Sequence, residues 1–397
     1  MGNNSYKYLI VGAGLAGASA IEGIREIDRD GSLALIGQEK NLPYDRPPLT
    51  KKLWFGKMPL EKVFRHDQSF YTENKVDLKL ATTVASIDPK QKTVADQSGN
   101  IIHYEKLLLA TGGRPTHLPL PGGDIEGLFY YRTLDDYLRL RPQAAPGKTA
   151  LVIGGGFIGS EIAAALALNQ VKVVMLFPGE YLCQRIFPET LGKAMEAHYL
   201  AQGIQIIHEK PASIIRQGEK FKTRTEQARE IESDMVIVGI GIQPETDLAA
   251  RAELTIANGI QVDAYLRTDA PDIYAAGDNA NFPCAALGKM TRLEHWDNAS
   301  SLGKHAGKNM AGAHQAFDYL PYFFSDLFEF GYEAVGEIDS KLEVVADWKE
   351  ENRQGTIYYV RDGKIQGVMM CNIWEQVDAA RRLIGQDEAA VKGLKVA

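Results

Sequence analysis

Two short glycine patterns in this sequence have the residue types and spacing that suit phosphate binding. They are Gly12-x-Gly14-x-x-Gly17 and Gly154-x-Gly156-x-x-Gly159. In such a pattern the first glycine makes a tight turn, the second lets backbone N–H groups approach a pyrophosphate, and the third lets a helix pack closely on a strand. The N-terminus of that helix also directs unpaired N–H groups and a positive dipole end at the phosphates. Each pattern therefore predicts one dinucleotide site.

The segments around each pattern supply the strands and helices that such a site requires. The first pattern lies between an apolar strand at 8–11 and a helix reaching about residue 27, with a second strand at 32–36. The second lies between a strand at 149–153 and a helix at 160–168, with a strand at 171–177. This order favours a binding βαβ unit over a glycine-rich turn that binds nothing, and Glu39, 22 residues after Gly17, suits an adenosine ribose. Because two dinucleotides in one chain usually exchange a hydride, the pair predicts FAD and a nicotinamide.

Composition excludes several other classes of protein. The 397 residues carry a net charge of −7, which argues against nucleic-acid binding because that needs a basic surface. No apolar run approaches the ~20 residues of a membrane span. The three cysteines, Cys183, Cys284 and Cys371, are far apart and odd in number, which favours a reducing, cytoplasmic location over a disulfide scaffold. No metal site is predicted.

The segment 41–56 contains two cations of interest. Pro43, Pro47 and Pro48 forbid a regular helix at its start, and a short helix is expected from Lys51 to Phe55. Arg46 suits a phosphate and Lys51 an active-site cation. The alternative is that both are solvated surface charges.

The remaining strands indicate an α/β chain with an inserted domain. Strands are expected within 78–98, and a buried strand at 107–109 and one at 235–239 each end in a glycine-rich exit. A strand near 273–275 ends at Asp278, whose carboxylate suits a ribityl hydroxyl. We expect two Rossmann-like domains, an FAD-binding domain of 1–120 and 246–320 and an NAD(H)-binding domain of 121–245. A smaller α+β domain follows at 321–397, with strands at 333–338, 342–348, 355–361 and 364–373 and a helix from 374. The helix within 288–312 has small residues on one face.

Several stretches together resemble a known family. PYDRPPLTKKLWF, LLLATGGRP, GGGFIGSEIAAAL, IYAAGD and LEHWDNA resemble the ferredoxin/rubredoxin reductase type of the FAD-dependent pyridine nucleotide-disulfide oxidoreductases. Within this superfamily the chain is most similar to the apoptosis-inducing factor group, through Leu176-Phe177-Pro178 and the segment 324–336. The resemblance covers nearly the whole chain. A DNA-directed role is not expected, because the charge balance is acidic.

The resemblance implies roles for particular side chains. Lys51 would reach the flavin near N5 and pair with Glu161, and Phe157 would cover the flavin face. Glu294, His295 and Trp296 would line the same cavity, and Phe324 would stack near the nicotinamide. From the residues alone, Glu161 also fits a first-turn helix acid, Phe157 ordinary packing and His295 a hydrogen-bonded loop histidine. Further cofactor-binding positions are expected at Leu15, Ala16, Arg46, Val84, Ala110, Thr111, Gly112, Arg114, Ile158, Glu180, Gly241, Gly277 and Asp278.

The choice of nicotinamide depends on the end of the second βαβ unit. Gly179 follows Phe177-Pro178, where the apoptosis-inducing factor group has its ribose-binding acid, and Glu180 comes next. A carboxylate ~4 Å from a 2′-phosphate would repel it by up to about 4 kcal/mol at an effective dielectric constant of ~20. NADH is therefore favoured over NADPH, although Arg185 could accept a 2′-phosphate.

Three functions compete. The first is an NADH-dependent flavoprotein oxidoreductase that passes electrons to a ferredoxin, a rubredoxin, a quinone or oxygen. The second, a disulfide or peroxide reductase, needs a cysteine beside the flavin, and residues 1–182 contain none. The third is a redox sensor with slow turnover, in which NADH gives a long-lived charge-transfer complex or a dimer. The chain is expected to be a monomer or a homodimer, including an NADH-dependent one.

Overall fold

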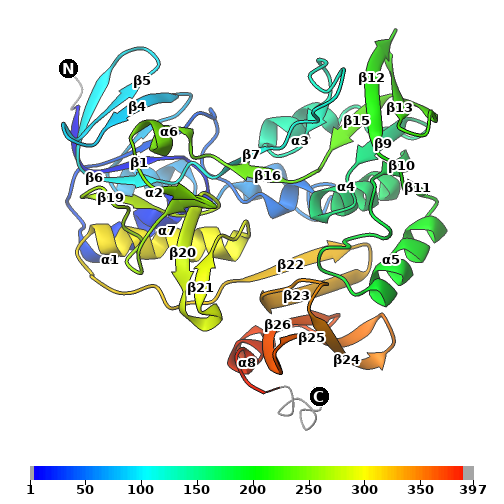
Figure 1. Cartoon of the computed structure of the whole chain (residues 1–397). Coiled ribbons are helices and arrows are strands. Elements are labelled where there is room, and N and C mark those ends of the chain that lie inside the picture. The colour runs from blue at the N-terminus through cyan, green and yellow to red at the C-terminus, as the bar shows by residue number, and fades with distance from the viewer. Residues whose placement is uncertain (1–3, 388–397) are drawn as a thin grey trace. The chain divides into compact units, whose positions relative to one another are not determined.

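The computed structural model describes residues 4–387, and the chain divides into two compact units made of separate stretches (Figure 1). The first unit takes the chain up to Asp45, Glu61–Arg114 and Pro244–Pro321. The second takes Arg46–Leu60, Pro115–Gln243 and the chain from Tyr322 onward. The short strands β7 (Gly113–Pro115) and β16 (Ile242–Pro244) contain two of these boundaries. The division into three functional domains stays a prediction.

The first unit is built on a largely parallel sheet around β1 (Ser5–Val11). Parallel neighbours lie on both sides of β1, with Val11 opposite Ile36 on one side and Leu109 on the other. The three strands therefore end at one edge, where Gly12 begins the turn. The other strands are β2 (Leu33–Ile36), β3 (Val76–Lys79), β4 (Val84–Asp88), β5 (Thr93–Asp96), β6 (Ile101–Leu109) and β19 (Ile273–Ala275).

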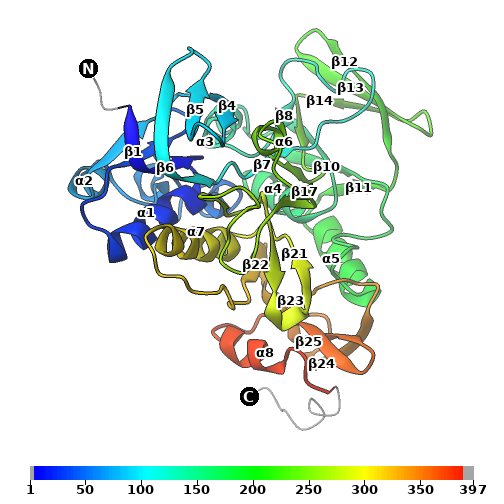
Figure 2. The ribbon, with the colours of Figure 1, turned by 60° about the vertical axis from the view of Figure 1, so that its left-hand side comes forward.

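Two helices of the first unit lie side by side, α1 (Leu15–Ile27) and α7 (Trp296–Met310), as Figures 1 and 2 show. A Cβ on Gly303 would stand 2.2 Å from the Ala16 carbonyl oxygen, and one on Gly307 would stand 2.2 Å from that of Ala20. Only residues without a Cβ allow this close approach. The small face expected for the helix within 288–312 is confirmed.

Shorter elements complete the first unit. They are α2 (Gln68–Glu73), α6 (Asp247–Arg251) and the four-stranded sheet of β17 (Ile256–Ala257), β18 (Gly259–Gln261), β20 (Ala280–Cys284) and β21 (Lys289–Thr291).

The second unit repeats the same plan around β9 (Thr149–Ile153). Ile153, at the end of β9, lies opposite Leu176 and Val238, so these parallel strands also end at one edge. The sheet order is β11-β10-β9-β15-β8, with β8 (Phe129–Tyr130), β10 (Lys172–Leu176), β11 (Gln205–Ile207) and β15 (Met235–Val238). The helices are α3 (Leu134–Leu140), α4 (Phe157–Leu168) and α5 (Glu189–Ala201). An antiparallel sheet of β12 (Pro211–Gln217), β13 (Lys220–Thr225) and β14 (Glu230–Ser233) shares its apolar core.

An antiparallel five-stranded sheet forms the C-terminal part of the second unit. Its order is β22-β23-β26-β25-β24, and the bounds are β22 (Tyr322–Leu327), β23 (Phe330–Gly336), β24 (Glu343–Glu350), β25 (Gln354–Arg361) and β26 (Lys364–Cys371). Helix α8 (Val377–Leu383) follows. Strand β22 was not among the expected strands, because Phe323 and Phe324 place aromatic rings on both of its faces.

The prediction of a short helix from Lys51 to Phe55 is wrong. A short 3₁₀ helix covers Pro47–Leu49, and turns follow it. Both Lys51 and Leu53 donate their backbone N–H to the Pro48 carbonyl oxygen at 3.2 Å, which closes turns instead of continuing a helix. A second 3₁₀ helix covers Leu60–Val63.

Within residues 4–387, no helix combines the length and the apolar character that crossing a bilayer demands.

Candidate cofactor-binding sites

The three glycines of the first pattern differ in what surrounds them. Gly12 has a φ of +121° and a Cβ there would stand 2.1 Å from the Ala110 carbonyl oxygen, while one on Gly17 would stand 2.1 Å from that of Gly12. A Cβ on Gly14 would meet nothing within 4 Å. Gly14 also has a φ of −93°, which other residues adopt, so its own protein surroundings do not require a glycine. The open space at the start of α1 fits a phosphate that approaches the backbone closely.

The second pattern has the same construction. A Cβ on Gly154 would stand 2.3 Å from the Gly239 carbonyl oxygen, and one on Gly159 would stand 2.0 Å from that of Gly154. A Cβ on Gly156, where α4 begins, would meet nothing within 4 Å. Gly241, which follows β15, has a φ of +105° and is equally open. Both units therefore fit the pyrophosphate of a dinucleotide.

Two carboxylates predicted to bind FAD follow strands of the first unit. Glu39 comes after β2, and its Oε2 accepts a hydrogen bond of 2.6 Å from the Tyr44 hydroxyl. Asp278 follows β19 and Gly277, and its carbonyl oxygen accepts from the Arg292 guanidinium at 3.1 Å. The same guanidinium donates to Glu294 at 2.7 Å. Arg292 therefore ties Glu294 to the end of β19.

His295 immediately precedes α7, and its imidazole has a strongly shifted pKa. Burial lowers its pKa to about 4, against the opposing effect of the Asp278 carboxylate. The imidazole is therefore neutral at pH 7. A neutral imidazole offers one donor and one acceptor nitrogen, which suits contact with a polar ligand better than charge compensation.

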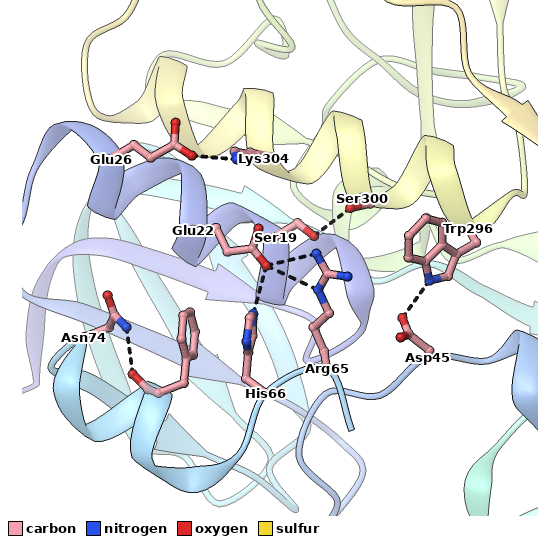
Figure 3. Close-up of polar contacts among 11 residues, drawn as sticks. Ser19, Glu22, Glu26, Asp45, Arg65, His66, Asn74, Trp296, Ser300 and Lys304 are labelled. Carbon is pink, nitrogen blue, oxygen red and sulfur yellow. Dashed lines mark hydrogen bonds and ion pairs between the residues drawn. The ribbon is translucent and has the colours of Figure 1, made fainter. Parts of the chain in front are cut away.

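Trp296, the first residue of α7, has a fixed orientation (Figure 3). Its indole N–H donates to Asp45 at 2.6 Å, and the Arg65 guanidinium lies 5.9 Å from the ring centroid. Arg65 is itself held by Glu22, whose Oε1 also lies 2.8 Å from Nε2 of His66. Asp45, Arg65 and Glu22 were not identified from the sequence.

The other predicted positions of the first unit lie at the ends of its strands and helices. Val84 begins β4, Leu15 and Ala16 begin α1, and residues 110–112 follow β6. Thr111 donates to the Glu245 carbonyl oxygen at 2.7 Å, and Arg114 pairs with the Glu245 and Asp247 carboxylates at 2.9 Å each. Their cofactor contacts stay predictions.

In the second unit the structure brings Lys51 and Glu161 together. The ammonium lies 3.2 Å from Glu161 Oε1, and each side chain is only 7% exposed. The Thr50 hydroxyl donates to Oε2 at 2.5 Å and the Ser325 hydroxyl donates to Oε1 at 2.5 Å. Sequence reasoning missed both hydroxyls, although each neighbours a residue that it had identified. A buried ion pair needs such additional donors to offset the loss of water.

Aromatic rings and a second carboxylate adjoin this pair. The Lys51 ammonium lies 4.5 Å from the centroid of the Phe324 ring, a cation–π contact, and 3.8 Å from Asp326 Oδ2. Phe157 is half-buried and meets the Phe323 ring edge to face, with centroids 5.6 Å apart. Of the predicted residues, Lys51, Glu161 and Phe324 therefore form one cluster.

A pocket of about 310 Å³ opens at the end of the second parallel sheet. Its lining is mainly apolar and includes Ile153, Gly154, Phe177 and Ile240. Glu180 lies just beyond Phe177 and is exposed, and its backbone N–H donates to the Gln184 side-chain oxygen at 3.1 Å. The pocket has the position and character expected for an adenine ring. Ile158 is exposed at the first turn of α4. Arg46 occupies the N-cap position of the 3₁₀ helix at Pro47–Leu49, and its side chain makes no capping hydrogen bond there.

The cysteines do not form a redox centre in the described part of the chain. Cys183, Cys284 and Cys371 are buried and free. Burial raises the pKa of all three thiols, that of Cys183 to about 12, so none is a thiolate at pH 7. Among residues 4–387, no group of histidine, cysteine, aspartate and glutamate side chains suits a metal ion.

Comparison with known proteins shows which family the chain belongs to. The sequence model described as "Pyridine nucleotide-disulphide oxidoreductase" matches residues 6–303. The chain belongs to the pyridine nucleotide-disulphide oxidoreductase family. Residues 306–354 of this oxidoreductase match "Apoptosis-inducing factor, mitochondrion-associated, C-term", which confirms the resemblance drawn from the sequence.

Its relatives include reductases of two kinds. The oxidoreductase is 32% identical to monodehydroascorbate reductase 3 of Arabidopsis thaliana, over 99% of this chain and 95% of that protein. It is 33% identical to the ferredoxin–NAD(+) reductase component of the anthranilate 1,2-dioxygenase system of Burkholderia cepacia, over 95% of this chain and 93% of that protein. The crystal structure of the covalent putidaredoxin reductase–putidaredoxin complex matches with a TM-score of 0.92 and 26% identity, over 98% and 96% of the two chains.

These findings confirm the α/β fold with two dinucleotide-binding parts and a C-terminal antiparallel sheet. The family binds FAD and a pyridine nucleotide. The chain is therefore an NAD(P)H-dependent flavin oxidoreductase. The two phosphate cradles, which are the open backbone positions at Gly14 and Gly156 at the starts of α1 and α4, fit that role.

Proposed function

We propose that this oxidoreductase transfers hydride from NADH to FAD and then passes the electrons to an external one-electron acceptor. The observation that carries the proposal is the pair of open glycines, Gly14 and Gly156, each at the start of a long helix. Two such cradles in one chain suit two dinucleotides that exchange a hydride.

The residues around each cradle support separate roles. In the first unit Gly14, Glu39 and Asp278 would hold FAD, with the neutral His295 and the fixed Trp296 beside them. FAD, when bound, accepts a hydride as an electron pair and releases electrons singly. In the second unit the Lys51 ammonium would stabilise negative charge that develops during the transfer, since it is desolvated and held by Glu161. Phe157 would exclude water.

NADH is proposed over NADPH because of the carboxylate that follows β10. Glu180 is exposed shortly after the end of β10, beside the residues that border the apolar pocket, and it lies 21 residues after Gly159, close to the spacing at which a dinucleotide-binding unit has its ribose-binding acid. A carboxylate there would accept a hydrogen bond from the 2′-hydroxyl of NADH and would repel the 2′-phosphate of NADPH.

The acceptor is proposed from the relatives. One relative is named for a ferredoxin and another for monodehydroascorbate, and the matching crystal structure contains putidaredoxin. A ferredoxin-type protein and monodehydroascorbate are therefore the acceptors to test first, with rubredoxin, a quinone and oxygen after them.

The match of residues 306–354 favours one alternative, a redox sensor like apoptosis-inducing factor. A sensor would turn over slowly and change its association when NADH binds.

An anaerobic titration tests both functions. NADH, and then NADPH, is added to the FAD-containing protein while the spectrum is recorded, and an acceptor or air follows. Bleaching that an acceptor reverses at once supports the reductase. Bleaching that persists for minutes in air, with a new long-wavelength band and a changed sedimentation coefficient, supports the sensor. If neither nucleotide bleaches the flavin, both proposals are wrong.

A further inference from the structure

We propose that Ser325 and Thr50 are positioning residues that hold the Glu161 carboxylate, and through it the Lys51 ammonium, in the geometry that hydride transfer needs. The inference rests on the proposed function, because it assigns these hydroxyls a part in that reaction. Neither residue is expected to touch a cofactor.

The first step concerns the two oxygens of Glu161. Each accepts one hydroxyl hydrogen bond of 2.5 Å, Oε1 from Ser325 and Oε2 from Thr50. Ser325 is 0% exposed and Thr50 is 4% exposed, so water does not replace either donor easily. Charge-assisted hydrogen bonds of this kind are short and strong. Together they fix the plane of the carboxylate and leave Oε1 facing Lys51.

The second step concerns how firmly the two hydroxyls are held. Ser325 lies in the middle of β22, paired with Tyr332 of β23. Thr50 follows the 3₁₀ helix at Pro47–Leu49, and its backbone N–H donates to the carbonyl oxygens of Pro47 and Pro48. Its hydroxyl lies 3.4 Å from the Pro47 carbonyl oxygen but 2.5 Å from Glu161, so the single proton serves Glu161. Both donors therefore come from backbone that its own hydrogen bonds make rigid.

The third step concerns the competing carboxylate. Lys51 lies 3.2 Å from Glu161 Oε1 and 3.8 Å from Asp326 Oδ2, and Asp326 is 46% exposed against 7% for Glu161. Each hydroxyl donor that is removed leaves one Glu161 oxygen with a hydrogen bond fewer, so the orientation of this buried carboxylate toward Lys51 is no longer fixed. The ammonium would then move toward Asp326. Ser325 and Asp326, adjacent on β22, thus act on Lys51 in opposite directions.

The experiment compares Ser325→Ala and Thr50→Val with the wild-type protein, each with FAD bound. Two quantities are measured: the limiting rate of anaerobic flavin reduction by NADH, and the flavin reduction potential without NADH. We expect each variant to lower the rate about tenfold with little change in the NADH concentration for half-maximal rate. The flavin reduction potential is expected to become more negative, because under the proposed function the positive charge of Lys51 moves away from the flavin. Thr50→Ser keeps the hydroxyl and the wild-type values.

A second comparison separates positioning from stability. Adding Asp326→Asn to Ser325→Ala removes the competing carboxylate and recovers part of the rate. Ser340→Ala, which removes a hydroxyl hydrogen bond to the Gln184 carbonyl oxygen, is the matched control and keeps the wild-type rate.

Three results would overturn the proposal. If NADH reduces the wild-type protein but both single variants keep its rate and potential, the positioning role alone is wrong. If both variants fold but lose FAD, the hydroxyls are structural. If neither nucleotide reduces the wild-type protein, the proposed function fails and this inference fails with it.

Discussion

Gly17 lies so close to Gly12 that a Cβ on Gly17 would stand 2.1 Å from the Gly12 carbonyl oxygen. Gly14, between them, would place a Cβ in open space. The three glycines of one pattern therefore serve different purposes. Gly12 and Gly17 are required by the fold, and Gly14 is explained only by a ligand.

The first prediction follows from this contrast. Gly14→Ala folds with unchanged or slightly raised stability, since alanine suits that backbone, and it binds FAD at least tenfold more weakly. Gly17→Ala loses about 3 kcal/mol of unfolding free energy or fails to fold, because a backbone contact must open. Denaturant unfolding and FAD titration measure the two effects. Wild-type FAD affinity in Gly14→Ala would show that the open space is not the phosphate site.

The second prediction concerns the choice of nucleotide. Glu180→Ala is expected to raise kcat/KM for NADPH relative to NADH by about tenfold, because it removes a carboxylate that repels a 2′-phosphate. Steady-state kinetics with both nucleotides measure the ratio. Glu189→Ala is the matched control, since Glu189 is an exposed acid in the first turn of α5 that pairs with Lys193. If the ratio of kcat/KM for NADPH to that for NADH is the same in the two variants, Glu180 does not determine the choice of nucleotide.

The third prediction concerns the cation of the buried pair. Lys51→Met keeps FAD bound, slows flavin reduction by NADH about a hundredfold, and lowers the unfolding free energy by about 3 kcal/mol because a buried carboxylate loses its partner. Adding Glu161→Gln restores most of the stability and none of the rate. Stopped-flow reduction and denaturant unfolding separate the two effects. Lys52→Ala alters an exposed neighbouring lysine and serves as control. An unchanged rate in Lys51→Met would exclude Lys51 from the reaction.

The fourth prediction concerns pH. The pKa of His295 is about 4 in the folded protein, against about 6.5 for a free histidine. Between these values the unfolded chain binds a proton that the folded one does not, so the unfolding free energy falls as pH decreases from 6.5 toward 4, by up to about 1.4 kcal/mol per pH unit. Unfolding curves of the wild-type protein and His295→Asn measure the effect. His295→Asn should lose the part of the pH dependence that His295 causes. If the unfolding free energies of the two proteins change with pH in parallel, the low pKa of His295 is contradicted.

The dinucleotide-binding parts were largely predictable because their signals are local. In the sequence, the glycine pattern, the strand before it and the helix after it are contiguous, and β9 was predicted with its observed bounds of Thr149–Ile153. The parallel register then brings the ends of β1, β2 and β6 to one edge, as the pattern implies. Lys51 and Glu161 were paired through the family resemblance.

The surroundings of that pair were not predictable, because their signals are not local. Thr50 lies 111 residues from Glu161 in sequence and Ser325 lies 164 residues from it. The stretch that contains Ser325 was not expected to be a strand, so nothing in the sequence indicated that its hydroxyl lies beside α4. The helix expected at 51–55 failed for a different reason, since the prolines that precede it favour a 3₁₀ turn that ends at once.

The separation between Glu161 and Ser325 also sets an order of events during synthesis. At 5–20 residues per second, a ribosome needs roughly 10–30 s to extend the chain by the 164 positions from Glu161 to Ser325. During that interval α4 is already made, but the second hydroxyl that its carboxylate needs is not. Lys51 and Thr50 are already made at that stage, but Glu161 can be buried with both hydroxyl donors only after β22 has been made.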